Sequence, residues 1–121
     1  MKKVFHLSSC NTCQKIIKQT NAASVCSLQD IKLQTVNAEE LDWLASKVGS
    51  FEALFSRKAL KFRLQGLHEK TLTEQDYRDL ILQEYTFLKR PVIVMDDTVF
   101  VGNAAKTVAA AEEFIKKNFS V

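Results

Sequence analysis

The hydrophobic and polar positions at the start of the chain predict a strand, a helix and a second strand. The mostly apolar run Lys3–Leu7 is typical of a short buried or edge strand. From Cys13 onward, apolar or small side chains recur at the helical spacing i, i+3, i+4, i+7, which predicts a helix over 12–21. Residues 24–31 alternate between apolar and polar side chains, which predicts a second strand. The first quarter of the chain therefore has the order β-α-β.

The middle of the chain has the pattern of separate helices. Asn37 is followed three residues later by Glu40, which is the spacing of a capping box, and an apolar stripe follows. Gly49 is typical of the residue that ends such a helix. Residues 51–66 are basic and only partly helical in pattern, and Thr73 is placed to cap a further helix. This part of the chain is therefore predicted to be helical throughout.

The last part of the chain completes an α/β pattern. Two apolar runs between 92 and 101 flank a polar turn, which predicts a β-hairpin, and a final helix is predicted from about 104 to 118. The order is then β-α-β, helices, β-β-α. With a right-handed crossover between the first two strands, this order is the thioredoxin-like arrangement. We expect a single domain over 1–121, with a helical insertion at about 37–88.

Composition and charge narrow the class of protein without changing the fold. The chain is 46% hydrophobic and 26% charged, which is ordinary usage for one globular domain. Its net charge of +3 is too small to favour direct nucleic-acid binding. No run approaches the roughly 20 apolar residues of a membrane span, and the basic N-terminus lacks the apolar core of a signal peptide. We therefore expect a cytoplasmic monomer with no membrane partner.

The candidate chemistry lies in Cys10-Asn11-Thr12-Cys13, where the first strand gives way to the first helix. Unpaired N–H groups and the helix dipole favour negative charge at that place, and thiols there can have pKa values of roughly 3.5–7.5. We expect Cys10 to be a nucleophilic thiolate and Cys13 to be the thiol that resolves its adducts. Because Cys13 also lies on the apolar stripe of the helix, the alternative is that it only packs inward.

The remaining cysteine and the histidines do not predict a metal site. An odd number of cysteines, 3, argues against a framework of structural disulfides. One Cys-x-x-Cys pair supplies only two ligands, and His6 and His68 do not have the spacing of a zinc finger. We expect no bound metal or cofactor. Cys26 is predicted to be a core thiol in the middle of the second strand, and a distant resolving role is its alternative.

Pro91, the single proline of the chain, stands at the start of the predicted third strand. In the thioredoxin-like fold, the position that faces the active thiol is a cis proline, and proline is the residue for which a cis bond costs little. We therefore expect Pro91 to occupy this position and to support the site.

Three motifs together resemble the arsenate reductase family, which includes the Spx-type transcription regulators. They are Phe5-His6-x-x-x-Cys10, the pair Arg57-Lys58, and the run Lys89-Arg90-Pro91-Val92-Ile93-Val94. Their order and spacing cover essentially the whole chain. The resemblance implies that a thiolate at Cys10 attacks an oxyanion, helped by backbone N–H groups at the helix start, which here belong to Asn11 and Thr12.

The resemblance also implies an anion clamp of three arginines, two of which match Arg57 and Arg90. At the third position this chain has Gly102-Asn103, and no arginine follows Arg90. For Arg57, the alternative is a solvated basic face, which could also meet an acidic protein partner. His6 matches a family histidine that could lower the pKa of the thiol when protonated, and an ordinary supporting histidine is the alternative.

Two functions of different classes follow from the resemblance. The first is an arsenate reductase-like thiol oxidoreductase that acts on arsenate, a similar oxyanion or another small electrophile. Its electrons would come from glutathione with glutaredoxin, or from thioredoxin. The second is an Spx-like regulator that binds RNA polymerase and uses Cys10 and Cys13 as a redox switch. The missing third arginine and the Cys-x-x-Cys pair favour the second function.

Overall fold

In the computed structural model, which describes residues 1–119, the chain forms two compact units. The first unit contains Met1–Gln34 and the chain from Arg90 onward, and the second unit is Thr35–Lys89. Among the described residues, no helix combines the length and the apolar character needed to cross a membrane.

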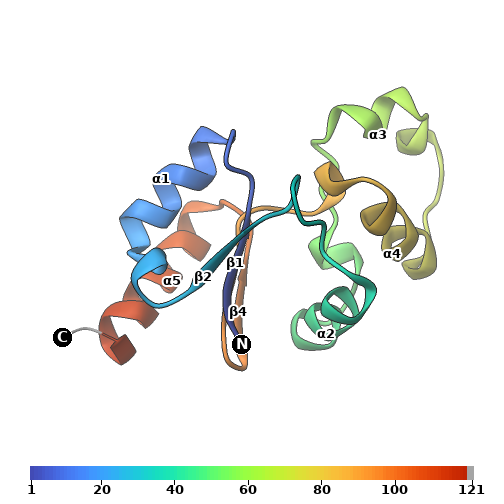
Figure 1. The fold of residues 1–121 in the computed structure, drawn as a ribbon. Helices are drawn as coiled ribbons and strands as arrows, with labels where there is room; N and C mark the ends of the chain where they lie inside the picture. The colour runs from blue at the N-terminus through green and yellow to red at the C-terminus, as the bar shows by residue number, and fades with distance from the viewer. Residues whose placement is uncertain (120–121) are drawn as a thin grey trace. The chain divides into compact units, whose positions relative to one another are not determined.

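A four-stranded mixed sheet forms the centre of the first unit (Figure 1). Its strands are β1 (Lys2–His6), β2 (Ser27–Asp30), β3 (Val92–Met95) and β4 (Thr98–Val101), in the order β2-β1-β3-β4. β1 pairs parallel with β2 and antiparallel with β3, and β3 pairs antiparallel with β4. This topology confirms the predicted thioredoxin-like α/β fold and the predicted hairpin.

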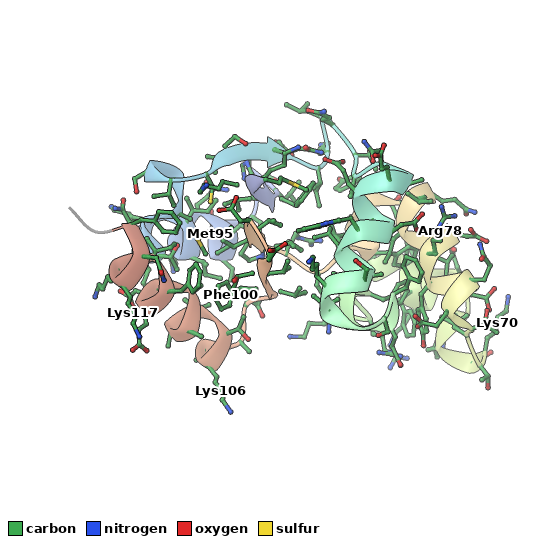
Figure 2. All side chains as sticks on the ribbon, turned by 90° about the horizontal axis from the view of Figure 1, so that it is seen from below. Lys70, Arg78, Met95, Phe100, Lys106 and Lys117 are labelled. Atoms are coloured by element: carbon green, nitrogen blue, oxygen red, sulfur yellow. The ribbon has the colours of Figure 1, made fainter. Side chains whose placement is uncertain are left out.

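Two helices lie side by side on one face of this sheet (Figure 1). They are α1 (Asn11–Thr20) and α5 (Ala105–Phe119). Figure 2 shows Lys106 and Lys117 extending outward from α5, away from the apolar side chains beneath it. The core between the helices and the sheet is built by ten buried residues: Val4, Ile16, Ile17, Ala22, Cys26, Ile93, Met95, Val108, Ala111 and Ile115.

The second strand is shorter than the predicted 24–31, because a turn occupies its expected start. Asn21 ends α1 in the left-handed conformation with φ 61°. A short 3-10 turn, η1 (Ala22–Ser24), follows it, and the ladder to β1 then begins at Ser27. Cys26 therefore lies just before β2, not in its middle. It is buried in the core, as predicted, and its thiol faces the Val94 carbonyl at 3.7 Å.

Inside β2, the buried positions do not follow the apolar residues. Leu28 is 46% exposed, whereas Gln29 is only 5% exposed. Both polar atoms of the Gln29 amide have a partner, because its oxygen accepts from Lys3 Nζ at 2.9 Å and its nitrogen donates to the Gln34 carbonyl at 2.9 Å. These two hydrogen bonds remove most of the cost of burying a polar group, so Gln29 can take the inward position.

The second unit contains helices α2 (Ala38–Val48), α3 (Leu60–Leu64) and α4 (Glu74–Gln83). As predicted, Asn37 and Glu40 form a capping box at the start of α2, and Gly49, with φ 105°, ends it. Thr73 and Asp76 form a second capping box at the start of α4. Three 3-10 turns complete the unit: η2 (Glu52–Leu54), η3 (Leu67–Glu69) and η4 (Tyr85–Phe87).

An aromatic cluster forms the centre of the second unit. The Phe55 ring stacks on Phe87 at a centroid distance of 5.1 Å and lies 4.9 Å from Tyr77 and 5.9 Å from Phe62. Phe55 also pairs with Leu88 in an isolated β-bridge. Aromatic pairs in such tilted and edge arrangements each stabilise the fold by about 0.5–1.5 kcal/mol beyond the effect of burying the rings.

Candidate active site

Cys10 occupies the cap position in front of α1, where the turn after β1 meets the helix. The Cys10 N–H donates to the Leu7 carbonyl at 3.0 Å, and the Cys10 carbonyl accepts from the Gln14 N–H at 3.1 Å. The residue is half-buried, and its backbone is extended, with φ −91° and ψ 109°. The predicted transition from strand to helix is confirmed, with α1 beginning at Asn11, one residue before the predicted start.

The surroundings of Cys10 favour its thiolate. Burial raises the pKa of this thiol, but the Cys13 backbone N–H, the Cys13 thiol and the Arg90 guanidinium together outweigh it, and the net pKa is lowered. The Cys13 N–H points toward the Cys10 sulfur without meeting the geometry of a capping hydrogen bond. It still favours the charged form of that sulfur. Two dipolar donors and one cation therefore converge on a single sulfur atom.

Cys13 has the opposite character, although it lies only one turn along the same helix. Its side chain is 0% exposed, and burial raises its pKa to about 11, assisted by the hydrogen bond and the charge of Cys10. The Leu7 backbone N–H and Arg90 act in the lowering direction but do not compensate. At neutral pH Cys13 is therefore a protonated thiol that donates toward the Cys10 sulfur. Both cysteines are free in the structure.

Asn11 and Thr12 fill the first two positions of α1, and both are exposed. Their backbone N–H groups are the first of the helix and therefore have no partner within it. No other group among residues 1–119 accepts a hydrogen bond from them. Such free N–H groups at a helix start form a general binding place for anions. The structure thus leaves the two predicted anion-binding positions accessible next to the Cys10 sulfur.

Arg90 and Pro91 reach the site from the segment that leads into β3. The Arg90–Pro91 peptide bond is cis, which agrees with the position that the sequence assigned to Pro91, and Pro91 is buried. The Pro91 carbonyl accepts from the Gly102 N–H at 2.9 Å, which ties the start of β3 to the residue after β4. The Arg90 side chain forms a hydrogen bond with Cys10. The structure therefore brings Arg90 together with the predicted nucleophile.

His6 lies at the end of β1 and is only 6% exposed. Its register partner in β2 is Asp30, and its Nδ1 atom lies 3.3 Å from Gln14 Nε2. The sequence suggested that a protonated His6 could lower the pKa of Cys10. In the structure the cation that lowers this pKa is Arg90, and His6 is not among the groups that shift it.

Arg57 belongs to the second unit, where it has partners of its own. Its Nη2 atom donates to Glu52 Oε2 at 2.7 Å and to the Tyr77 hydroxyl at 2.8 Å, and the guanidinium lies 5.5 Å from the centre of the Tyr77 ring. Both hydrogen bonds use the same nitrogen. Nε and Nη1 of Arg57 consequently have no partner among the described residues.

Gln14 is the site residue that sequence reasoning missed. It follows the Cys-x-x-Cys pair directly, and its side chain contacts both His6 and the Leu7 carbonyl. Glutamine at an exposed helix position is common and gives no signal in the sequence. Its contacts depend on how the strand and the helix pack, which the sequence pattern does not specify.

These observations define a thioredoxin-like domain with two thiols at the start of its first helix, one of lowered pKa and one buried. The model of the ArsC family matches residues 5–111, so the chain belongs to the ArsC family. The predicted membership of the arsenate reductase family is confirmed. No curated protein matches the sequence.

Solved structures with the same fold include three of comparable length. An arsenate reductase from Vibrio cholerae is 15% identical with a TM-score of 0.74, and the match covers 91% of this chain and 98% of that one. An arsenate reductase (ArsC) related protein from Brucella melitensis is 23% identical with a TM-score of 0.68, covering 90% and 92%. A protein from Staphylococcus aureus is 24% identical with a TM-score of 0.70, covering 100% of both chains. At these identities the likeness establishes the fold.

Proposed function

We propose that the protein is an arsenate reductase-like thiol oxidoreductase in which Cys10 is the nucleophile and arsenate or a similar oxyanion is the substrate. The observation that carries the proposal is the convergence of the Cys13 N–H, the Cys13 thiol and Arg90 on the Cys10 sulfur. The free N–H groups of Asn11 and Thr12 support it, because they suit an anionic substrate. Membership of the ArsC family supports the choice of reaction.

In the first proposed step, the Cys10 thiolate attacks the arsenic atom of arsenate. A sulfur–arsenic bond forms, one arsenic–oxygen bond breaks, and the leaving hydroxyl takes up a proton and departs as water. Arsenic stays pentavalent in this step. The Arg90 guanidinium and the N–H groups of Asn11 and Thr12 stabilise the negative charge that develops on the oxygens, because charged and preorganised donors act strongly there.

In the second proposed step, Cys13 resolves the adduct. Its deprotonated sulfur attacks the Cys10 sulfur, so a disulfide forms and the sulfur–arsenic bond breaks. The electron pair of that bond stays on arsenic, which becomes trivalent and leaves as arsenite. Formation of the adduct removes the Cys10 charge, one of the causes that raise the pKa of Cys13. Loss of this cause favours deprotonation of Cys13 once Cys10 has reacted, provided that Arg90 and the helix-start N–H groups compensate the charge of the bound oxyanion.

The third proposed step restores the two thiols. The Cys10–Cys13 disulfide takes two electrons from an external dithiol or from two glutathione molecules. The proposed donors are glutathione with glutaredoxin, or thioredoxin, and neither requires a metal or a cofactor bound to this chain. These reductants are maintained in the cytoplasm, where we propose that the protein works.

We further propose that Arg57 contributes to binding of the oxyanion. Its Nε and Nη1 atoms are the donors that Glu52 and Tyr77 leave unused. Arginine suits this role because its planar, permanently charged group can donate two parallel hydrogen bonds to an oxyanion. With Gly102 and Asn103 in place of a third arginine, we expect weaker binding of arsenate than a clamp of three arginines would give.

Arsenate-dependent oxidation of NADPH tests the proposed function. The assay is coupled in parallel to glutathione with glutaredoxin and to thioredoxin, and it compares the wild type with Cys10→Ser, Cys13→Ser and Cys26→Ser. We expect turnover in the wild type and in Cys26→Ser, whose thiol lies in the core. We expect none in Cys10→Ser, and a strong loss in Cys13→Ser with at least one donor.

The absence of turnover with both donors would contradict the enzyme proposal. In that case, binding of purified RNA polymerase α subunit by the oxidised and the reduced protein would test the regulator hypothesis. The Cys-x-x-Cys pair and Gly102-Asn103 in place of a third arginine favour the regulator, but no described residue marks a polymerase-binding surface, so the regulator enters only as an outcome of this test. Turnover that persists in Cys10→Ser would show that another residue carries the chemistry.

A further inference from the structure

The Leu7 carbonyl, at the end of the first strand, accepts two hydrogen bonds from the start of α1. One comes from the Cys10 backbone N–H at 3.0 Å, and the other comes from the side-chain nitrogen of Gln14 at 3.1 Å. The same carbonyl therefore holds the backbone of the nucleophile and one side chain of the following turn. A carbonyl oxygen can only accept, so the atom of Gln14 that faces it must be the amide nitrogen.

The same nitrogen of Gln14 also reaches His6. It lies 3.3 Å from His6 Nδ1, and since the amide nitrogen donates, this ring nitrogen accepts. The arrangement requires a lone pair on Nδ1, so the ring proton of a neutral His6 is on Nε2. Gln14 thus joins two consecutive residues of the strand end, His6 and Leu7, to the first turn of α1.

The backbone of this strand end makes further hydrogen bonds. The His6 carbonyl accepts from the Ile31 N–H at 2.9 Å, and the Leu7 N–H approaches the Cys13 sulfur. Residues Ser8 and Ser9, between the strand and Cys10, are exposed. The turn that carries Cys10 is held to β2 at Ser8, whose hydroxyl donates to Asp30, and is otherwise positioned through its two ends, between which Gln14 supplies a side-chain link.

We propose that Gln14 is a positioning residue of the reaction, whose amide holds the strand end and the first turn of α1 in register and so keeps the Cys10 sulfur aligned with its donors. This inference rests on the proposed role of Cys10 as the nucleophile. The donors concerned are the Cys13 N–H, the Cys13 thiol and the Arg90 guanidinium. Gln14 acts only through these groups and does not itself touch the substrate.

Charged and titratable groups from α1, from the segment before β3 and from β2 surround this link. Cys13 on α1 and Arg90 before β3 act on Cys10. Asp30 on β2 interacts with His6 and accepts a short hydrogen bond from the Ser8 hydroxyl. Replacement of Gln14 by an uncharged side chain removes the link without changing any of these charges. A change in the reactivity of Cys10 would then report its alignment.

The test is the rate of Cys10 alkylation by iodoacetamide between pH 5 and pH 10, resolved by peptide mass spectrometry. It compares the wild type with Gln14→Met, which keeps the length of the side chain and removes the amide. Gln19→Leu is the matched control, because Gln19 lies on the same helix and its amide contacts only Glu112, at 3.5 Å. Gln14→Asn, whose amide is one methylene too short, is a second variant in case Gln14→Met does not fold.

We expect the midpoint of the Cys10 profile to move upward in Gln14→Met, with about a threefold lower rate at pH 7, and to stay unchanged in Gln19→Leu. We also expect the 15N signal of His6 Nδ1 to shift in Gln14→Met. A folded Gln14→Met or Gln14→Asn protein with the wild-type profile would overturn the inference. Because alkylation does not use arsenate, a lack of arsenate turnover would count against the proposed function and not against Gln14.

Discussion

At the scale of single residues, Cys10 and Cys13 differ in what surrounds each sulfur. Cys10 is half-buried beside a cation and two donors, and its pKa is lowered despite its burial. Cys13 is fully buried, and its pKa is raised to about 11. The two sulfurs of the pair therefore differ: the Cys10 site favours the thiolate, whereas Cys13 stays a protonated thiol at neutral pH.

Removal of the Arg90 guanidinium should raise the pKa of Cys10. A lowered thiol pKa means that the thiolate is populated at lower pH, so loss of the cation moves the rise in reactivity to higher pH. We expect Arg90→Leu to alkylate Cys10 about tenfold more slowly at pH 7, with little change above pH 10 where the thiol is ionised in both proteins. Arg63→Ala, an exposed arginine of α3, is the control. Equal profiles for Arg90→Leu and wild type would contradict this electrostatic role.

Removal of the Cys10 sulfur should lower the pKa of Cys13. Burial is the first cause of the raised value, and the hydrogen bond and charge of Cys10 add to it. In Cys10→Ala, we expect the midpoint of Cys13 labelling to fall below about 11 and to stay above the ordinary value of 9.0, since burial remains. Labelling of Cys13 from pH 8 to pH 12 measures this shift. A midpoint that does not move would mean that the two sulfurs are not coupled.

At the scale of elements, local signals in the sequence were sufficient for helices with explicit caps. The capping box of Asn37 and Glu40 and the final Gly49 set the limits of α2 as predicted. The limits of β2 could not be predicted in the same way. They depend on the turn at Asn21 and on the hydrogen bonds that bury Gln29, both of which arise from packing across the sheet.

The cap of α2 makes a measurable contribution to stability. Asn37 Oδ1 accepts from the Glu40 N–H at 2.7 Å, and Glu40 Oε1 accepts from the Asn37 N–H at 3.1 Å. We expect Asn37→Ala to lower the free energy of unfolding by about 1 kcal/mol, because it leaves a helix-start N–H without its partner. Urea unfolding measures the change. Asn103→Ala, at an exposed loop position, should be neutral, and a neutral Asn37→Ala would contradict the role of the cap.

At the scale of the whole molecule, the two units divide the residues that the sequence assigned to the site. Cys10, Cys13, Arg90 and Pro91 all belong to the first unit. The sequence identified these residues because strand order and family motifs place them at one end of the sheet. Arg57 belongs to the second unit, and its contacts with Glu52 and Tyr77 were not predicted, because Glu52 lies in a segment without a clear hydrophobic period and the contact with Tyr77 depends on how α4 packs.

Replacement of Arg57 tests whether the second unit takes part in the reaction. We expect Arg57→Ala to raise the KM for arsenate about tenfold, the equivalent of one lost charge-assisted contact. Arg78→Ala is the matched control, because Arg78 lies in the same unit and forms a comparable ion pair with Asp42 at 2.7 Å. Both pairs are at least partly exposed, so each variant should cost at most about 1 kcal/mol in stability. An equal KM for the two variants would show that Arg57 does not contribute to binding of the substrate.

The central claim, that Cys10 attacks the oxyanion and that Cys10 and Cys13 together supply the two electrons that reduce it, is tested most directly by a single turnover without a reductant. The fully reduced protein is mixed with arsenate, arsenite is quantified, and the disulfides are mapped by mass spectrometry. We predict one arsenite for each Cys10–Cys13 disulfide formed, and no arsenite from Cys10→Ser. Arsenite formed while Cys10 remains a free thiol, or no arsenite from the fully reduced wild type, would contradict the claim.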